Sequence, residues 1–377
     1  MKWATTILVA AVAGLMALGM VILYSASMAQ TGPRYLLMQM AWGGLGLLAC
    51  MAATVVDYRR LQTFAWPLLA VTLLLLILVL IPGIGVERNG ARRWFNLGPM
   101  HFQPSELAKV GLIVALAAYG ARFQARMHEL KRGLLIPGIV LAVALGLIFR
   151  EPDFGTTLLL AAVSVMVLLV AGADWRYLVP PALAGAALFA LAVFNDPVRM
   201  KRIMAFLHPD EHKADAGFQA YHAMLALGSG GTTGLGLGNG RQKLGFVPEH
   251  HTDFIFSIVG EELGVAATLA VVVAFMAIVA CGLFISWRSG NRFGQLLGCG
   301  LTFLIGLQAF INIGVVTSAL PNKGLPLPFM SYGGSSLFVM LGVVGLLLSI
   351  ASRASESAPA QAPSTVAVSE NPFAEAP

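Results

Sequence analysis

The feature that most limits how this chain can fold is a series of long, almost uncharged apolar runs separated by polar stretches. A helix needs about 20 apolar residues to cross the hydrocarbon core of a bilayer, whereas a membrane β-strand needs about ten and alternates in polarity. These runs have the helical length and do not alternate. Of the 377 residues, 58% are hydrophobic and 11% are charged. The sequence therefore predicts an all-α polytopic membrane protein.

About ten transmembrane helices are expected. The first run could be a signal peptide, because Lys2 precedes it and Ser27, Met28 and Ala29 offer a cleavage pattern. It is longer than the 7–15 residues of a signal peptide's apolar region, so we expect an uncleaved helix. The runs are residues 5–24, 35–56, 64–81, a run that begins at 104, 134–149, 154–171, 177–194, 254–287, 293–317 and 337–350.

The charges between the runs predict the topology. Ten spans place both termini on one side of the membrane. The short loops on that side carry more Lys and Arg than those on the other, once residues 195–253 are set aside, because long loops are poor topology signals. We therefore expect both termini in the cytoplasm and a large extracellular loop, residues 195–253, between helices 7 and 8.

The ends of the chain and its charge complete this picture. Residues 1–353 are expected to form one transmembrane domain, and residues 354–377, which are rich in Ala, Ser and Pro, a disordered cytoplasmic tail. The net charge of +6 is confined to loops, which suggests contact with anionic lipid or phosphate. Nothing in the sequence indicates a nucleic-acid partner.

One polar stretch, residues 228–264, interrupts the apolar pattern. Seven glycines fall between Gly228 and Gly240, and at about 1 kcal/mol each they exclude a helix there. Asp253 follows directly before an apolar run, at the lip of a helix. A carboxylate in that position is either a functional group or an N-cap of the helix, and position alone leaves both interpretations open.

Several long motifs carry a family resemblance. They are VPEHHTDFIFSIVGEELG with QKLGF before it, NKGLPLPFMSYGGSSL, NGARRW followed by FQPSE and a lysine, REPDFGT and YSAS. Together they resemble the shape, elongation, division and sporulation (SEDS) family over residues 20–352, closer to its cell-division type than to its elongation type. The resemblance implies a multi-pass glycosyltransferase that polymerises peptidoglycan from lipid II.

The resemblance also implies site residues. Glycosyl transfer to a sugar hydroxyl needs a base and cations that stabilise the departing diphosphate, and we expect Asp253 to be the general base. Glu106 and Lys109 lie three residues apart on one helix face, where they could form a salt bridge or line a polar cavity. Residues that match family positions lining the central cavity, or that could bind the diphosphate, are Glu106, Lys109, Asp153, Arg241, Lys243 and Ser331.

Other groups in the polar stretch have weaker interpretations. Gly234–Gly240 is similar to a dinucleotide loop, but no strand precedes it, so a closely packed or flexible loop and a plain linker stay open. Glu261 and Glu262 need an internal polar network, which Gln308 and Asn312 could complete.

A metal site is also conceivable from the sequence. Glu249, His250, His251 and Asp253 are potential metal ligands, but neighbouring histidines in an extended chain point apart, which argues against zinc. The resemblance instead implies dependence on a divalent cation, Mg²⁺ or Mn²⁺, which suits oxygen ligands and a diphosphate.

The family also implies partners and a location. The expected partners are lipid II, a class B penicillin-binding protein and other membrane proteins of cell division or elongation, because the chain lacks the SxxK and KTG motifs of a transpeptidase. The expected location is the bacterial cytoplasmic (inner) membrane. Two alternatives are a lipid II flippase, since charged groups beside broken helices also mark transport pathways, and a non-enzymatic scaffold for division proteins.

The topology can be tested with cysteine labelling. In intact cells, a cysteine that replaces Lys213 in the long loop should react with a membrane-impermeant thiol reagent, and one that replaces Glu129 should not. Labelling of permeabilised cells is the control, because both sites must then react. The reverse pattern in intact cells would place Asp253 on the cytoplasmic side.

Overall fold

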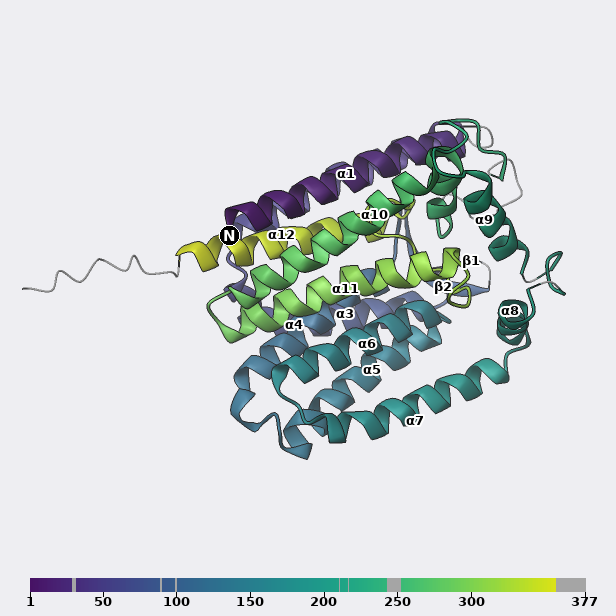
Figure 1. The fold of residues 1–377 in the computed structure, drawn as a ribbon. Helices are drawn as coiled ribbons and strands as arrows, with labels where there is room; N and C mark the ends of the chain where they lie inside the picture. Colours follow the sequence, from purple (N-terminus) through teal and green to yellow (C-terminus); the bar gives the residue numbers. More distant parts are fainter. Residues whose placement is uncertain are drawn as a thin grey trace, which may run out of the picture.

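The computed structural model describes residues 1–28, 32–88, 90–98, 100–209, 211–215, 217–242 and 252–356. Over these residues the chain forms a bundle of ten long helices, which confirms the all-α polytopic prediction (Figure 1). They are α1 (Lys2–Ser27), α2 (Arg34–Val55), α3 (Arg59–Leu80), α4 (Pro104–Arg122), α5 (Ile136–Arg150), α6 (Phe154–Ala171), α7 (Trp175–Phe194), α10 (Ile255–Trp287), α11 (Arg292–Val316) and α12 (Gly334–Glu356).

Nine spans of the described chain are long and apolar enough to cross a membrane, and α4 is not among them. This helix is the centre of the bundle: it packs against α3, α6 and α11, and most of its side chains are buried. It can carry Glu106 and Lys109 because the surrounding helices, rather than lipid, enclose it. By contrast, α7 lies at the edge of the bundle with little of its surface buried (Figure 1).

The polar loop expected before α4 is a small antiparallel sheet. Its strands are β1 (Gly85–Arg88), β2 (Ala91–Leu97) and β3 (Met100–Phe102), in the order β1-β2-β3. Gly90 and Gly98 lie in the connections, and both have positive φ, a conformation that favours glycine. This sheet was not predicted from the sequence, because β1 and β3 are only four and three residues long and the residues of β2, ARRWFNL, do not alternate in polarity.

The long interval after α7 is not a plain loop, although no described part of it spans the membrane. It contains α8 (Pro197–Leu207) and α9 (Phe218–Ser229). Asp196 caps α8, since its Oδ1 accepts hydrogen bonds from the amides of Val198 (3.0 Å) and Arg199 (3.2 Å). The Asp-Pro pair is a readable start signal for this helix.

The glycine-rich stretch packs against a break in α10, which decides between its open interpretations. Gly264 has φ 75° and interrupts the helix. The amides of Leu235 and Gly236 bond to the carbonyls of Glu261 (2.9 Å) and Glu262 (3.0 Å), which the break leaves without helical partners. The stretch is therefore a closely packed loop, in which a Cβ on residue 234 would overlap the backbone of α10.

The two ends of the bundle differ. Figure 1 shows the N-terminus and the C-terminal end of α12 at one end, with α8, α9 and the sheet at the other. The start of α1 and the end of α12 therefore lie at the same end of the bundle, as ten long helices that run back and forth through it require. The α8–α9 end is the outer one in the predicted topology, and the residues after Glu356 lie outside the described chain.

Candidate functional site

Three of the predicted site residues are connected with the segment between α11 and α12: Asp253 faces it, Ser331 belongs to it, and Lys109 is joined to it through Gln308. This segment, residues 321–333, is called the strap: its first seven residues have no regular secondary structure, and it ends in a turn before α12. Leu325, Leu327 and Phe329 are buried, which anchors the strap in the bundle. An extended chain buried in this way has carbonyl groups that no neighbouring amide can satisfy, so side chains must do so.

Two amide side chains of α11 supply these hydrogen bonds. Asn312 Nδ2 donates to the carbonyl of Leu325 (2.7 Å) and to the carbonyl of Asp253 (2.8 Å). One turn earlier, Gln308 Nε2 donates to the carbonyl of Pro326 (2.9 Å). Asn312 therefore joins the strap directly to the backbone of the predicted base. From the sequence, Gln308 and Asn312 could have completed a polar network around Glu261 and Glu262. Their described hydrogen bonds go to the strap, to Asp253 and to Lys109 instead.

Asp253 lies at the start of α10 and remains partly exposed. The helix begins at Ile255 with Phe254 in the N-cap position, so the interpretation of Asp253 as the N-cap does not hold. Its carboxylate faces the strap, because a Cβ on Gly324 would lie 3.1 Å from Oδ2. The structure thus leaves this carboxylate at the surface of a well-supported backbone.

Glu106 and Lys109 form the salt bridge that the sequence analysis had left open. Lys109 Nζ lies 2.8 Å from Glu106 Oε2 and donates to Gln308 Oε1 at 3.0 Å. Both residues are buried, Lys109 completely. The ion pair therefore supports the strap through Gln308, and in this structure the ammonium group is enclosed by protein. Removal of one partner of such a pair typically costs 3–5 kcal/mol.

Asp153 and Ser331 also have structural partners. Asp153 caps α6, with Oδ1 accepting from the amide of Thr156 (3.1 Å) and Oδ2 from Gln103 Nε2 (3.1 Å). Ser331 Oγ accepts from the amide of Leu327 (2.8 Å) and so stabilises the turn of the strap. Both residues are largely buried, and their described hydrogen bonds are structural ones.

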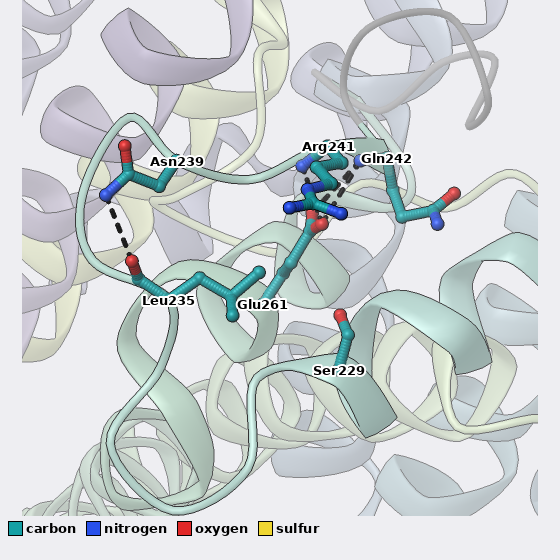
Figure 2. A pocket seen from close by; sticks show the side chains of 6 residues that line it. All are labelled: Ser229, Leu235, Asn239, Arg241, Gln242 and Glu261. Atoms are coloured by element: carbon teal, nitrogen blue, oxygen red, sulfur yellow. Dashed lines mark hydrogen bonds between the residues drawn. The ribbon is translucent and has the colours of Figure 1, made fainter.

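The polar loop before residue 243 forms a pocket of about 440 Å³. Figure 2 shows Arg241 beside Glu261, with the Arg241 side chain exposed. The pocket is lined by Ser229, Leu235, Asn239, Arg241, Gln242 and Glu261. Lys243, Glu249, His250 and His251 lie outside the described residues, so the structure does not place these predicted ligands.

Lys323 is a cation that the sequence analysis did not single out. It lies in the strap beside Gly324, is partly buried, and has its Nζ 5.7 Å from the centre of the Phe189 ring. Burial lowers the pKa of its ammonium group below the ordinary value. Its carbonyl lies against Gly155 at the start of α6. The readable signal was a lysine within NKGLPLPF, an otherwise apolar Pro/Gly-rich stretch.

Glu151, between α5 and α6, is a buried acid in an unusual state. Both of its carboxylate oxygens lack hydrogen-bond partners among the described residues. Burial, reinforced by the negative charge of Asp153, raises its pKa to about 9, although the nearby Arg93 acts in the opposite direction. This carboxyl group is therefore protonated at neutral pH.

Comparisons with known proteins show what this chain is similar to. The family model described as "Cell cycle protein", of FtsW, RodA and SpoVE, matches residues 5–356. The "probable peptidoglycan glycosyltransferase FtsW" of Geobacter metallireducens is 40% identical over 93% of this chain and 95% of its own. The protein of the same name from Nitrosococcus halophilus is 42% identical over 91% of each chain. "Stage V sporulation protein E" of Bacillus subtilis is 36% identical over 89% of this chain and 93% of its own.

Solved structures give the same result. One chain, from a study titled "Structural coordination of polymerization and crosslinking by a peptidoglycan synthase complex", has a TM-score of 0.78 and 33% identity, covering 92% of this chain and 97% of its own. The crystal structure of the rod shape determining protein RodA from Thermus thermophilus has a TM-score of 0.68 and 32% identity, covering 92% of this chain and 95% of its own. The similarity thus extends over the helices and the strap.

The protonated state of Glu151 predicts a pH-dependent stability. The folded protein keeps this carboxyl protonated up to about pH 9, while an unfolded chain ionises it near 4.5. Its contribution to stability is therefore greatest below pH 4.5 and falls as the pH rises towards 9. In Glu151→Gln, the melting temperature in detergent should decline less between about pH 5 and 9 than in the parent.

The control for this measurement is Glu129→Gln, which changes an exposed glutamate. It should leave the slope of melting temperature against pH as in the parent. Equal slopes for the parent and Glu151→Gln would mean that the buried carboxyl is not protonated in the folded protein.

Proposed function

The chain belongs to the cell cycle protein family of FtsW, RodA and SpoVE, and we propose that it polymerises glycan strands of peptidoglycan from lipid II, as a multi-pass glycosyltransferase. The observation that carries this proposal is Asp253. It is a partly exposed carboxylate that faces the strap, with its backbone fixed by Asn312. Its position at the α8–α9 end suits a substrate that carries sugars on the outer side of the membrane.

The reaction that fits this site is transfer of a glycan from a lipid diphosphate to a sugar hydroxyl. Asp253 accepts the proton of the acceptor hydroxyl as the oxygen attacks the anomeric carbon of the donor. The bond from that carbon to the diphosphate breaks, and the diphosphate leaves with the bonding electrons. A base in such a role contributes about 10²–10⁴-fold to the rate.

The departing diphosphate needs positive charge, and Lys323 suits this role better than Lys109. Lys109 is enclosed and already neutralised by Glu106, whereas Lys323 has only the contact with the Phe189 ring among its described interactions. Lys323 also lies next to Gly324, which faces Asp253. Arg241, on the exposed loop of the same end, is a second candidate, and Lys243 remains a third from the sequence alone.

A divalent cation is compatible with this site. Among the described residues no group of three or more Asp, Glu, His or Cys side chains could hold a metal alone. Mg²⁺, however, commonly binds one or two carboxylates together with substrate phosphates and water. Asp253 would hold such an ion, which would neutralise the charge that develops on the diphosphate.

The proposal extends to a partner and a location. The chain from the peptidoglycan synthase study is similar to this one over almost its whole length. A class B penicillin-binding protein, which crosslinks the strands that this protein makes, is therefore the partner that we propose, within the machinery of cell division or elongation. The bacterial cytoplasmic membrane is the corresponding location.

The flippase alternative is not favoured. The relatives from Geobacter metallireducens and Nitrosococcus halophilus, each matched over more than nine tenths of this chain, are named glycosyltransferases. In the structure, the charged pair Glu106–Lys109 at the centre of the bundle is closed off from solvent rather than arranged along a path.

The general base is tested by Asp253→Asn. Asparagine has nearly the same size but accepts no proton at neutral pH, so polymer formation from lipid II by the purified protein, with and without its partner, should fall about 10²–10⁴-fold. Expression and melting temperature should stay close to the parent. If the variant recovers activity at higher Mg²⁺ or Mn²⁺, Asp253 acts by holding the cation. Parent-like polymerisation would exclude Asp253 from the mechanism.

The role of Lys323 is tested by Lys323→Gln. Loss of a group that stabilises developing negative charge should reduce turnover by roughly 10²-fold, and Lys323→Arg should restore part of it. Lys213→Gln is the matched control, because Lys213 also lies over an aromatic ring, that of Tyr221, but outside the strap. Equal polymer yields from the two glutamine variants would assign the diphosphate to other cations.

A further inference from the structure

We propose that Glu261 and Glu262 are positioning residues, which hold residues 238–242 against the first turns of α10, the part of the helix that follows Asp253. This inference rests on the proposed function, because it names what places the base. Neither glutamate contacts Asp253 through a described interaction. They act through the backbone of the loop, which we call the anchored loop (residues 238–242).

Glu261 holds the end of the anchored loop. Its Oε1 accepts hydrogen bonds from the amides of Arg241 (2.7 Å) and Gln242 (3.1 Å), as the dashed lines in Figure 2 show. Its side chain is 1% exposed. A buried carboxylate that accepts two amide hydrogen bonds is a strong and directional contact, since charge-assisted bonds are about twice as strong as neutral ones.

Glu262 holds the beginning of the anchored loop and joins it to α1. Its Oε2 accepts from the amide of Gly238 (3.1 Å), and the hydroxyl of Ser25 lies 2.8 Å from both carboxylate oxygens. It is fully buried. Ser25 belongs to the YSAS motif at the outer end of α1, so three separate parts of the chain meet at these two carboxylates.

Gly240 lies between the two carboxylates. A Cβ at this position would be 2.9 Å from Glu261 Oε2 and 2.9 Å from Glu262 Oε1. Two buried carboxylates on either side of one glycine repel each other, and without the amide hydrogen bonds their burial would be costly. The anchored loop and the glutamates therefore depend on each other: the loop neutralises the carboxylates, and the carboxylates fix the loop.

This arrangement matters for the reaction because Glu261 and Glu262 lie only eight and nine residues after Asp253, in the part of α10 that precedes its break at Gly264. Asn312 bonds to the carbonyl of Asp253 and fixes the start of this part. The anchored loop, held by Glu261, packs against its other end. A misplacement of about 1 Å in a reacting group can cost about 10²-fold in rate, so release of either end is enough to lower turnover.

The experiment compares Glu261→Ala with Glu261→Gln in the full chain, with two readouts. Hydrogen exchange of the amides in residues 238–242 reports whether the glutamates hold the anchored loop, a set of contacts that we call the clamp. Polymer formation from lipid II reports kcat and KM. Alanine removes the acceptor, so exchange of the Arg241 and Gln242 amides should speed up and kcat should fall by roughly 10²-fold, with less change in KM. Glutamine keeps an acceptor oxygen and should retain most of the protection and turnover.

Gly240→Ala tests the same clamp with both glutamates in place, in case the loss of a buried side chain prevents folding. The added methyl group should displace the carboxylates, speed up exchange and lower kcat. Gly228→Ala is the matched control: its Cβ would meet nothing within 4 Å, and it lies in the same glycine-rich stretch. It should behave as the parent in both readouts.

The outcomes separate the inference from the proposed function. Faster exchange with parent-like kcat would overturn the positioning role while the glycosyltransferase stands, and unchanged exchange in Glu261→Ala would overturn the clamp itself. A parent protein that makes no polymer, alone or with its partner, would count against the proposed function. The inference would then fail as a statement about catalysis, whatever the exchange shows.

Discussion

The hydrogen bonds from Asn312 and Gln308 to the strap are the contacts on which the rest of the site depends. The strap contains three prolines, Pro321, Pro326 and Pro328, and a proline has no backbone N–H to donate to a sheet or a helix. Its buried carbonyls therefore need donors from elsewhere, and α11 presents two amides one turn apart. Because Asn312 also bonds to the carbonyl of Asp253, the same contact that stabilises the strap fixes the backbone of the base.

Buried charge is handled in three different ways in this bundle. Glu106 is neutralised by an ion pair with Lys109, which in turn bonds to Gln308 and so to the strap. Glu261 is stabilised by backbone amides of a loop. The carboxyl oxygens of Glu151 have no hydrogen-bond partner among the described residues, and this group is protonated instead. Each arrangement avoids an uncompensated charge at low dielectric. Asp253 differs from these three acids, because its side chain is partly exposed to solvent.

The broken helix α10 links these arrangements to the outer surface. Its break at Gly264 frees carbonyl groups that the glycine-rich loop satisfies, and the loop then continues to the amides that Glu261 and Glu262 bind. The glycines permit close approach of one backbone to another. The glycines therefore serve close packing, and the fold gives no support to the likeness to a nucleotide-binding loop.

The sequence by itself determined the fold class, the approximate helix limits and the family, because the period and length of apolar runs are local properties and the motifs are long. It also singled out Asp253 as a candidate, since a carboxylate at the start of a membrane helix is unusual. Only the tertiary structure decided which polar groups pair. Lys109 with Gln308, Asn312 with Asp253, and Glu262 with Ser25 join residues from distant helices. Such pairs depend on how the helices pack against one another, which residue spacing along the chain does not reveal.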